Sequence, residues 1–162
     1  MPTSRIIGVD PGLISTGWGV IEVKQGTLTF VACGTIAPKK DLPMAERLLA
    51  LQRGLSGIID AHYPTQAAIE ETFVSENGQS TLKLGQARGA LLVTLAAAGL
   101  PIAEYAARLV KKSITGSGRA EKEQLAQMVG VLLPASRGPL AECRHDAADA
   151  LAIAITHANH VL

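Results

Sequence analysis

The stretch RIIGVDPG, residues 5–12, decides the fold, because a short apolar run ends in the carboxylate of Asp10 and a Pro-Gly pair follows it directly. The apolar run predicts a strand over residues 5–9. Two further runs, 16–23 and 27–37, have the composition of strands and are separated by Gln25-Gly26. Short turns between successive strands favour antiparallel pairing, so the first third of the chain predicts an antiparallel meander.

Helical and strand patterns alternate in the remainder of the chain. The spacing of leucine and isoleucine predicts a helix over 43–61, and a mostly apolar strand over 66–72 follows it. The later expected elements are a helix at 80–98, a strand at 101–105, helices at 106–114 and 120–133, a loop at 134–142 and a helix at 146–158. This order predicts an α/β fold with a mixed five-stranded sheet flanked by helices.

Composition favours one domain over residues 1–162, since 48% of the 162 residues are hydrophobic and only 18% are charged. No basic and apolar leader opens the sequence, and the uncharged run 89–103 is shorter than the roughly 20 residues that span a bilayer. We therefore expect a soluble, cytoplasmic protein. Little tail is expected after the last helix, because the sequence ends at Leu162. Two cysteines agree with a reducing compartment.

Four carboxylates are the candidate catalytic groups. Glu70 interrupts an apolar strand, where a charge needs a partner or a metal. Asp146 and Asp149 are three residues apart, so a helix presents them on one face, and the alanines around them allow close packing on a sheet. If these acids meet Asp10, their repulsion requires cations, and oxygen ligands favour Mg²⁺ or Mn²⁺. Two such ions suit phosphodiester hydrolysis.

Simpler interpretations remain open for single residues. Asp10 alone is typical of a turn, and Asp146 alone is typical of a first helical turn. A zinc site is the alternative for one small set of sulfur and nitrogen ligands: Cys143, His145, His157 and His160. His145 is otherwise expected to be a residue near a helix start rather than a ligand or proton carrier.

A basic stretch runs from residue 108 to residue 122. It holds five of the fifteen lysines and arginines and a single acid, Glu121. The five are Arg108, Lys111, Lys112, Arg119 and Lys122. The stretch predicts contacts with phosphate, although a solvated helix face with a basic loop explains the same pattern.

Several motifs together resemble one family. They are GVDPG at 8–12 with Gly17 and Gly19, AIE at 68–70 with Phe73, LKLGQARG at 82–89, EYAAR at 104–108 with Lys111, AEK at 120–122, and DAADALAIA at 146–154. In this order they are similar to the RuvC family of bacterial crossover-junction endodeoxyribonucleases.

The resemblance implies a ribonuclease H-like fold and a homodimer that nicks a four-way Holliday junction symmetrically, in homologous recombination and DNA repair. A two-fold dimer suits a two-fold substrate. By resemblance, two Mg²⁺ ions are held by the four acids: Asp10, Glu70, Asp146 and Asp149. Lys111 and Lys122 then act near the scissile phosphate, and the helix after Ser80 forms the dimer. A branch-migration motor is the implied partner.

Phe73 has two interpretations. An aromatic residue just beyond a core strand usually packs inside, whereas the resemblance implies a wedge that stacks on a base of the junction. Lys83 and Arg88, within the 82–89 motif, join the basic stretch as expected DNA contacts.

Three alternatives to the junction enzyme remain at this point. They are another ribonuclease H-like nuclease directed at RNA, a junction-binding module without catalysis, and an actin-like ATPase that uses the Asp10 turn. The chain is short for the two lobes of such an ATPase.

Overall fold

The computed structural model describes residues 2–72, 74–143 and 145–161, and its five strands form one mixed sheet in the order β3-β2-β1-β4-β5. The strands are β1 (Ser4–Asp10), β2 (Thr16–Lys24), β3 (Thr27–Ile36), β4 (Gln66–Glu70) and β5 (Ile102–Tyr105). The first three pair antiparallel, while β4 pairs parallel with both β1 and β5. The predicted meander and mixed five-stranded sheet are confirmed.

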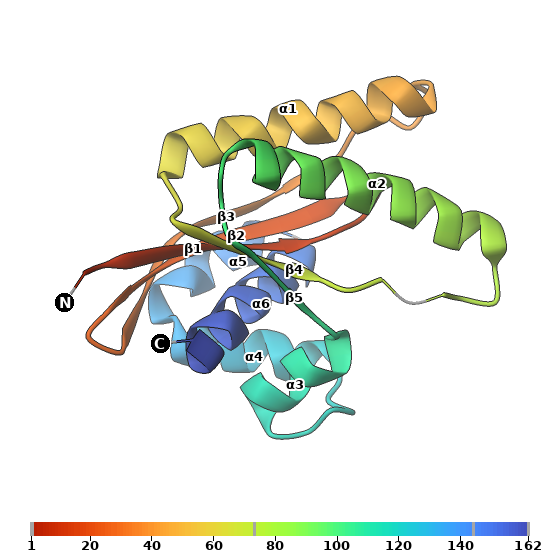
Figure 1. Cartoon of the computed structure of the whole chain (residues 1–162). Helices are drawn as coiled ribbons and strands as arrows, with labels where there is room; N and C mark the ends of the chain where they lie inside the picture. Colours follow the sequence, from red (N-terminus) through yellow and green to blue (C-terminus); the bar gives the residue numbers. More distant parts are fainter. Residues whose placement is uncertain (1, 73, 144, 162) are drawn as a thin grey trace.

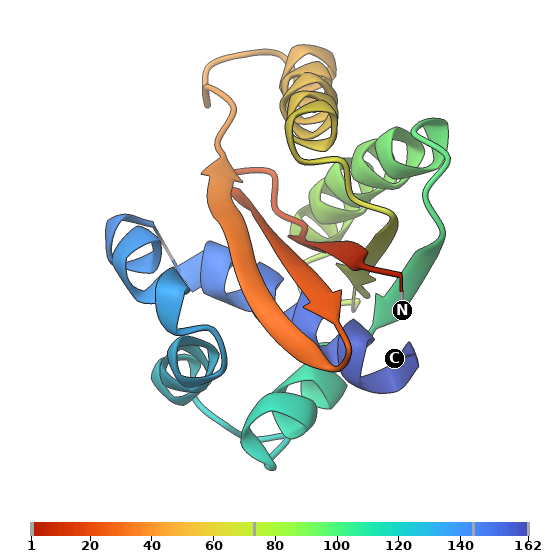
Figure 2. The ribbon, with the colours of Figure 1, turned by 90° about the vertical axis from the view of Figure 1, so that its left-hand side faces the viewer.

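Helices cover both faces of this sheet (Figures 1 and 2). On one face lie α1 (Met44–His62) and α2 (Gly78–Ala97). On the other lie α3 (Ala107–Thr115), α4 (Lys122–Leu132), the short 3₁₀ helix η1 (Pro134–Ser136), α5 (Arg137–Glu142) and α6 (His145–Val161). Each face has its own apolar core. Burying both faces explains why β1 and β4 are almost continuously apolar.

Local sequence accounts for most of these elements. The β2–β3 hairpin turns at Gln25 and Gly26, both with positive φ, 50° and 78°. Helix α1 starts after Pro43 and buries Leu51, Leu55 and Ile59, which recur every four residues. Among the residues described, no helix is long and apolar enough to cross a bilayer.

The expected loop over 134–142 is wrong, because η1 and α5 occupy this segment. Gly138 and Pro139 both have low helix propensity, so the segment carries little local helix signal. In the fold, Pro139 is the third residue of α5. A proline in the first turn breaks no helical hydrogen bond, since the N–H groups there have no partner within the helix. The expected strand over 66–72 also ends earlier, at Glu70.

Candidate metal centre

Asp10 and Glu70 end two neighbouring parallel strands. Asp10 is the last residue of β1 and Glu70 the last of β4, and the register pairs Val9 with Ile69 just before them. Parallel strands end at the same edge of a sheet, so the two side chains lie next to each other. The two carboxyl groups are close enough for Glu70 to raise the pKa of Asp10.

Helix α6 brings two more carboxylates to this edge. Its backbone lies directly against the sheet at two glycines, because a Cβ at Gly8 would collide with the carbonyl of Ala150 and one at Gly17 with the carbonyl of Asp146. The alanines of α6 provide the other half of this close contact, and Ala147, like Ala150, is fully buried. The approach places the first turns of α6 beside the end of β1.

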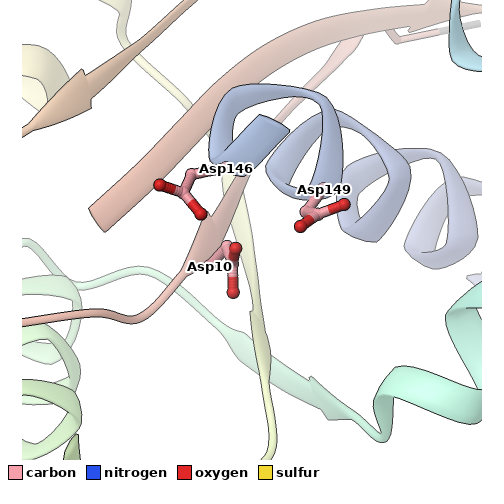
Figure 3. A group of neighbouring side chains, drawn as sticks. All are labelled: Asp10, Asp146 and Asp149. Atoms are coloured by element: carbon pink, nitrogen blue, oxygen red, sulfur yellow. The ribbon is translucent and has the colours of Figure 1, made fainter. Parts of the chain in front are cut away.

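Three of the acids converge in one group, as Figure 3 shows. Asp10, Asp146 and Asp149 each offer a carboxylate oxygen, and these atoms all lie within 4.8 Å of one another. Within residues 2–72, 74–143 and 145–161, this is the one cluster of three or more acidic, histidine or cysteine side chains with such spacing. Glu70 lies beside Asp10 but outside the group of three.

The electrostatics of the group favour a bound cation. Burial, the hydrogen bond to Glu70 and repulsion from neighbouring acids raise the pKa of Asp10 to about 10. Burial also raises the pKa of Asp149 to about 6, although the cation of Lys122 opposes the rise. Without a cation Asp10 therefore retains its proton at neutral pH. Close, partly buried carboxylate oxygens fit a hard divalent ion.

The acids line a pocket of about 350 Å³, which we call the acidic pocket. All four predicted acids belong to its wall, and Lys111 of α3 and Lys122 of α4 belong to it as well. Two cations therefore share one cavity with four carboxylates. A phosphodiester in this pocket would lie near carboxylates that can hold a metal ion and near lysines that can pair with its negative charge.

The structure places the other predicted basic residues outside the acidic pocket. Arg108, Lys112 and Arg119 are exposed. Arg88 forms an ion pair with Glu104, and its Nε donates a hydrogen bond to the Glu70 carbonyl at 3.1 Å. Arg88 thus supports the end of β4 in addition to carrying charge.

Lys83 lines a second pocket on the other side of Asp146. Phe73, the predicted junction wedge, lies outside the described residues.

The histidines of the zinc alternative have other partners. His157 is buried, and its ring nitrogens hydrogen-bond to the Tyr105 hydroxyl at 2.8 Å and the Gln66 side-chain oxygen at 2.7 Å. His160 contacts the Thr156 carbonyl. His145 opens α6, is exposed, and lowers the pKa of Asp149 through its charge.

Sequence analysis overlooked two residues that shape the β1–β2 loop. The hydroxyl of Thr16 donates to the Gly12 carbonyl at 2.6 Å and accepts from the Gly12 N–H, which closes the loop after Asp10. Arg47 of α1 donates to the Leu13 carbonyl at 3.3 Å. Thr16 follows the motif closely enough to be found locally, but Arg47 lies 34 residues from Leu13 and carries no local signal.

A sheet of this order with carboxylates at the ends of β1 and β4 and at the start of α6 defines the class of ribonuclease H-like, metal-dependent nucleases. The family model described as "Crossover junction endodeoxyribonuclease RuvC" matches residues 6–157. The chain therefore belongs to the RuvC family.

Individual relatives agree with this assignment. The RuvC protein of Azorhizobium caulinodans is 60% identical over 156 residues, covering 96% of this chain and 90% of the relative. That of Xanthobacter autotrophicus is 59% identical with the same coverage. A solved structure, T. thermophilus RuvC in complex with Holliday junction substrate, matches with a TM-score of 0.86 and 32% identity, over 96% of this chain and 93% of the other. The predicted family and fold are confirmed.

Proposed function

We propose that this protein is a structure-selective endodeoxyribonuclease that resolves four-way Holliday junctions by paired, symmetric nicks during recombination and repair. The observation that carries the proposal is the acidic pocket, where four carboxylates and two lysines line one cavity in a RuvC-family fold. The similarity to a RuvC solved with a Holliday junction supports the choice of substrate.

Asp10, Glu70, Asp146 and Asp149 would hold two Mg²⁺ ions. When bound, such ions activate water for attack on a phosphodiester and stabilise the leaving oxygen. Hard carboxylate ligands support Mg²⁺, with Mn²⁺ as a substitute. The raised pKa of Asp10 and Asp149 supports a cation at this site rather than an acid–base pair alone.

Lys111 and Lys122, which line the same pocket as the acids, would bind the scissile phosphate. Lys122 already acts on the site, since its charge lowers the pKa of Asp149. Alanine at either lysine is expected to slow cleavage while metal binding persists, because neither lysine is a metal ligand. Loss of metal occupancy, measured by calorimetry, would instead assign them a structural role.

Helix α2 would form the homodimer. Its inner face is buried on the sheet, yet Leu82 and Val93 on the same helix are 65% and 67% exposed. An apolar side chain on each end of one exposed face suits a self-complementary contact. Sedimentation should give a dimer, and Val93→Asp should shift it toward monomer. A complex with a branch-migration motor is proposed from the family alone.

The deciding experiment is cleavage of a synthetic four-way DNA junction in Mg²⁺. Linear duplex and an RNA–DNA hybrid serve as alternative substrates, and Asp10→Asn as the inactive control. Symmetric nicks confined to the junction and lost in Asp10→Asn would support the proposal. Cleavage of the hybrid would point to an RNA-directed nuclease, and metal-independent binding without cleavage to a junction-binding module.

A further inference from the structure

A second pocket of about 500 Å³ adjoins the acidic pocket. The β1–β2 loop forms one wall, Arg47 of α1 another, and the first turns of α2, including Lys83, a third. Gly12, Ser15 and Asp146 line both pockets, so the two are neighbours. We call it the basic pocket, because its charged lining comprises two cations and one acid, Asp146, whose side chain also belongs to the metal centre.

Two polar atoms in the basic pocket are buried without a partner. Within the described part of the chain, the Ser15 hydroxyl and the Arg47 Nε are the buried side-chain polar atoms that make no hydrogen bond. One terminal nitrogen of Arg47 does bond, to the Leu13 carbonyl at 3.3 Å. Both atoms are closed off from solvent, so they reach a ligand only if their side chains turn toward the pocket. Because an unpaired buried N–H or hydroxyl is costly, a ligand that supplies acceptors would favour that turn.

The chemistry of the lining selects an anion with several acceptor oxygens. A guanidinium presents donors in a fixed fork that matches phosphate, and Lys83 of α2 adds a second cation to the lining. Leu13, Ile14 and Leu84 supply apolar surface. Phosphate oxygens next to an apolar sugar face are what a nucleic-acid strand presents.

We propose that Arg47, Ser15 and Lys83 bind the phosphodiester that neighbours the scissile one on the cleaved DNA strand. This inference rests on the function proposed above. A strand with one phosphate at the acids has its next phosphate close by, and the lining that the two pockets share at Gly12 and Asp146 places the basic pocket next to the site of cleavage. Arg47 is thereby a positioning residue: it fixes the register of the strand across the metal centre and also holds the loop after Asp10 through Leu13.

The test compares Arg47→Met and Lys83→Met with Arg53→Met. Arg53 is an exposed residue on the same helix as Arg47 and lines neither pocket, so it controls for the loss of one positive charge. Junction binding is measured against salt in an Asp10→Asn background, which keeps the DNA intact. Each lost phosphate contact should lower the slope of log affinity against log salt by about 0.7 to 0.9. Arg53→Met should leave it unchanged.

Junctions with a single uncharged methylphosphonate then locate the contact. Neutralising the linkage next to the cleaved one should weaken binding about tenfold for the parent protein, as expected for a lost charge-assisted contact, and hardly at all for Arg47→Met. Neutral linkages elsewhere should affect both proteins equally. Lys83→Met provides the same test through an exposed residue that no fold contact requires, should Arg47→Met fold poorly.

Two results would overturn the inference. If both variants respond to every neutral linkage as the parent does, while Arg47→Met only lowers the melting temperature, Arg47 is a brace for the β1–β2 loop. If the unsubstituted protein neither binds nor cuts an all-phosphate junction, the proposed function fails first and the inference with it.

Discussion

Asp10→Asn should stabilise the metal-free protein and remove its response to Mg²⁺. In the folded protein without metal, the pKa of Asp10 rises to about 10 and that of Asp149 to about 6, from ordinary values of 3.8. The folded state therefore holds protons that the unfolded chain has lost, and stability falls as pH rises from about 4. For Asp149 the rise corresponds to about 3 kcal/mol at pH 8, since one pKa unit is about 1.36 kcal/mol.

Asparagine at position 10 carries no charge at any pH, so the folded variant no longer has to hold a proton there that the unfolded chain has lost. Keeping Asp10 protonated at pH 8, 4.2 pH units above its ordinary pKa of 3.8, costs the folded protein about 6 kcal/mol, so we expect a gain of up to about 6 kcal/mol in EDTA, or about 12 to 24 °C in melting temperature for a domain of this size. The gain should shrink at pH 5, where the unfolded carboxyl groups begin to bind protons too. Mg²⁺ at 100 times its dissociation constant should stabilise the unsubstituted protein by about 2.7 kcal/mol and the variant far less.

Thermal unfolding followed by circular dichroism, at pH 8 and pH 5 and with EDTA or Mg²⁺, measures the stability gain at each pH and the Mg²⁺ shift of each protein. A variant that melts below the unsubstituted protein in EDTA at pH 8 would refute the reasoning, because folding would then not require Asp10 to bind a proton. An equal Mg²⁺ shift in both proteins would show that the ion binds elsewhere.

Three further predictions test packing and burial in the fold. Gly17→Ala should weaken Mg²⁺ binding in calorimetry and junction cleavage in nicking assays at least tenfold, because its methyl group displaces the Asp146 backbone. The control is Gly57→Ala on α1, where nothing lies within 4 Å of the added methyl group; it should gain about 0.5 to 1 kcal/mol in urea unfolding. Tyr105→Phe should cost about 1 to 3 kcal/mol in the same urea assay, since buried His157 loses a hydrogen-bond partner, and an unchanged midpoint would argue against this network. The Cys33 thiol should react with iodoacetamide at pH 8 at least about a hundredfold more slowly in folded than in urea-unfolded protein, because burial raises its pKa to about 12 and the thiolate is the nucleophile; equal rates by mass spectrometry would contradict this.

The sequence allowed the sheet to be predicted because its signals are local. Alternating composition, the Gln25-Gly26 turn and the apolar run before Asp10 act over a few residues, and they specify strands and pairing without knowledge of the rest of the chain. Helix α5 was missed for the complementary reason. Pro139 disfavours a helix on average, and only its position in the first turn makes it harmless.

The candidate metal centre was predictable in its members but not in its geometry. Acids at the end of an apolar strand and on one face of an alanine-rich helix identify Asp10, Asp146 and Asp149. Nothing local indicates which of them share an ion, and the structure groups these three while Glu70 stays beside Asp10. The role of Arg47 could not be predicted from the sequence. A single arginine in an amphipathic helix is ordinary, and its contact with the Leu13 carbonyl forms only when the β1–β2 loop packs against α1.

Packing and charge at this site depend on each other. Gly8 and Gly17 let the backbone of α6 touch the sheet, and this contact forces Asp146 and Asp149 toward Asp10 at a distance where the three repel. The apolar contacts of α6, whose residues from Ala150 to Ala158 are all buried, are what hold the acids together in the absence of a cation. A substitution that loosens α6 would therefore relieve the repulsion and lose the ion in the same step. Variants in the α6 interface should therefore lose more metal affinity than folding stability. Relief of the repulsion among the acids offsets part of the stability lost with the packing, whereas nothing offsets the loss of metal affinity.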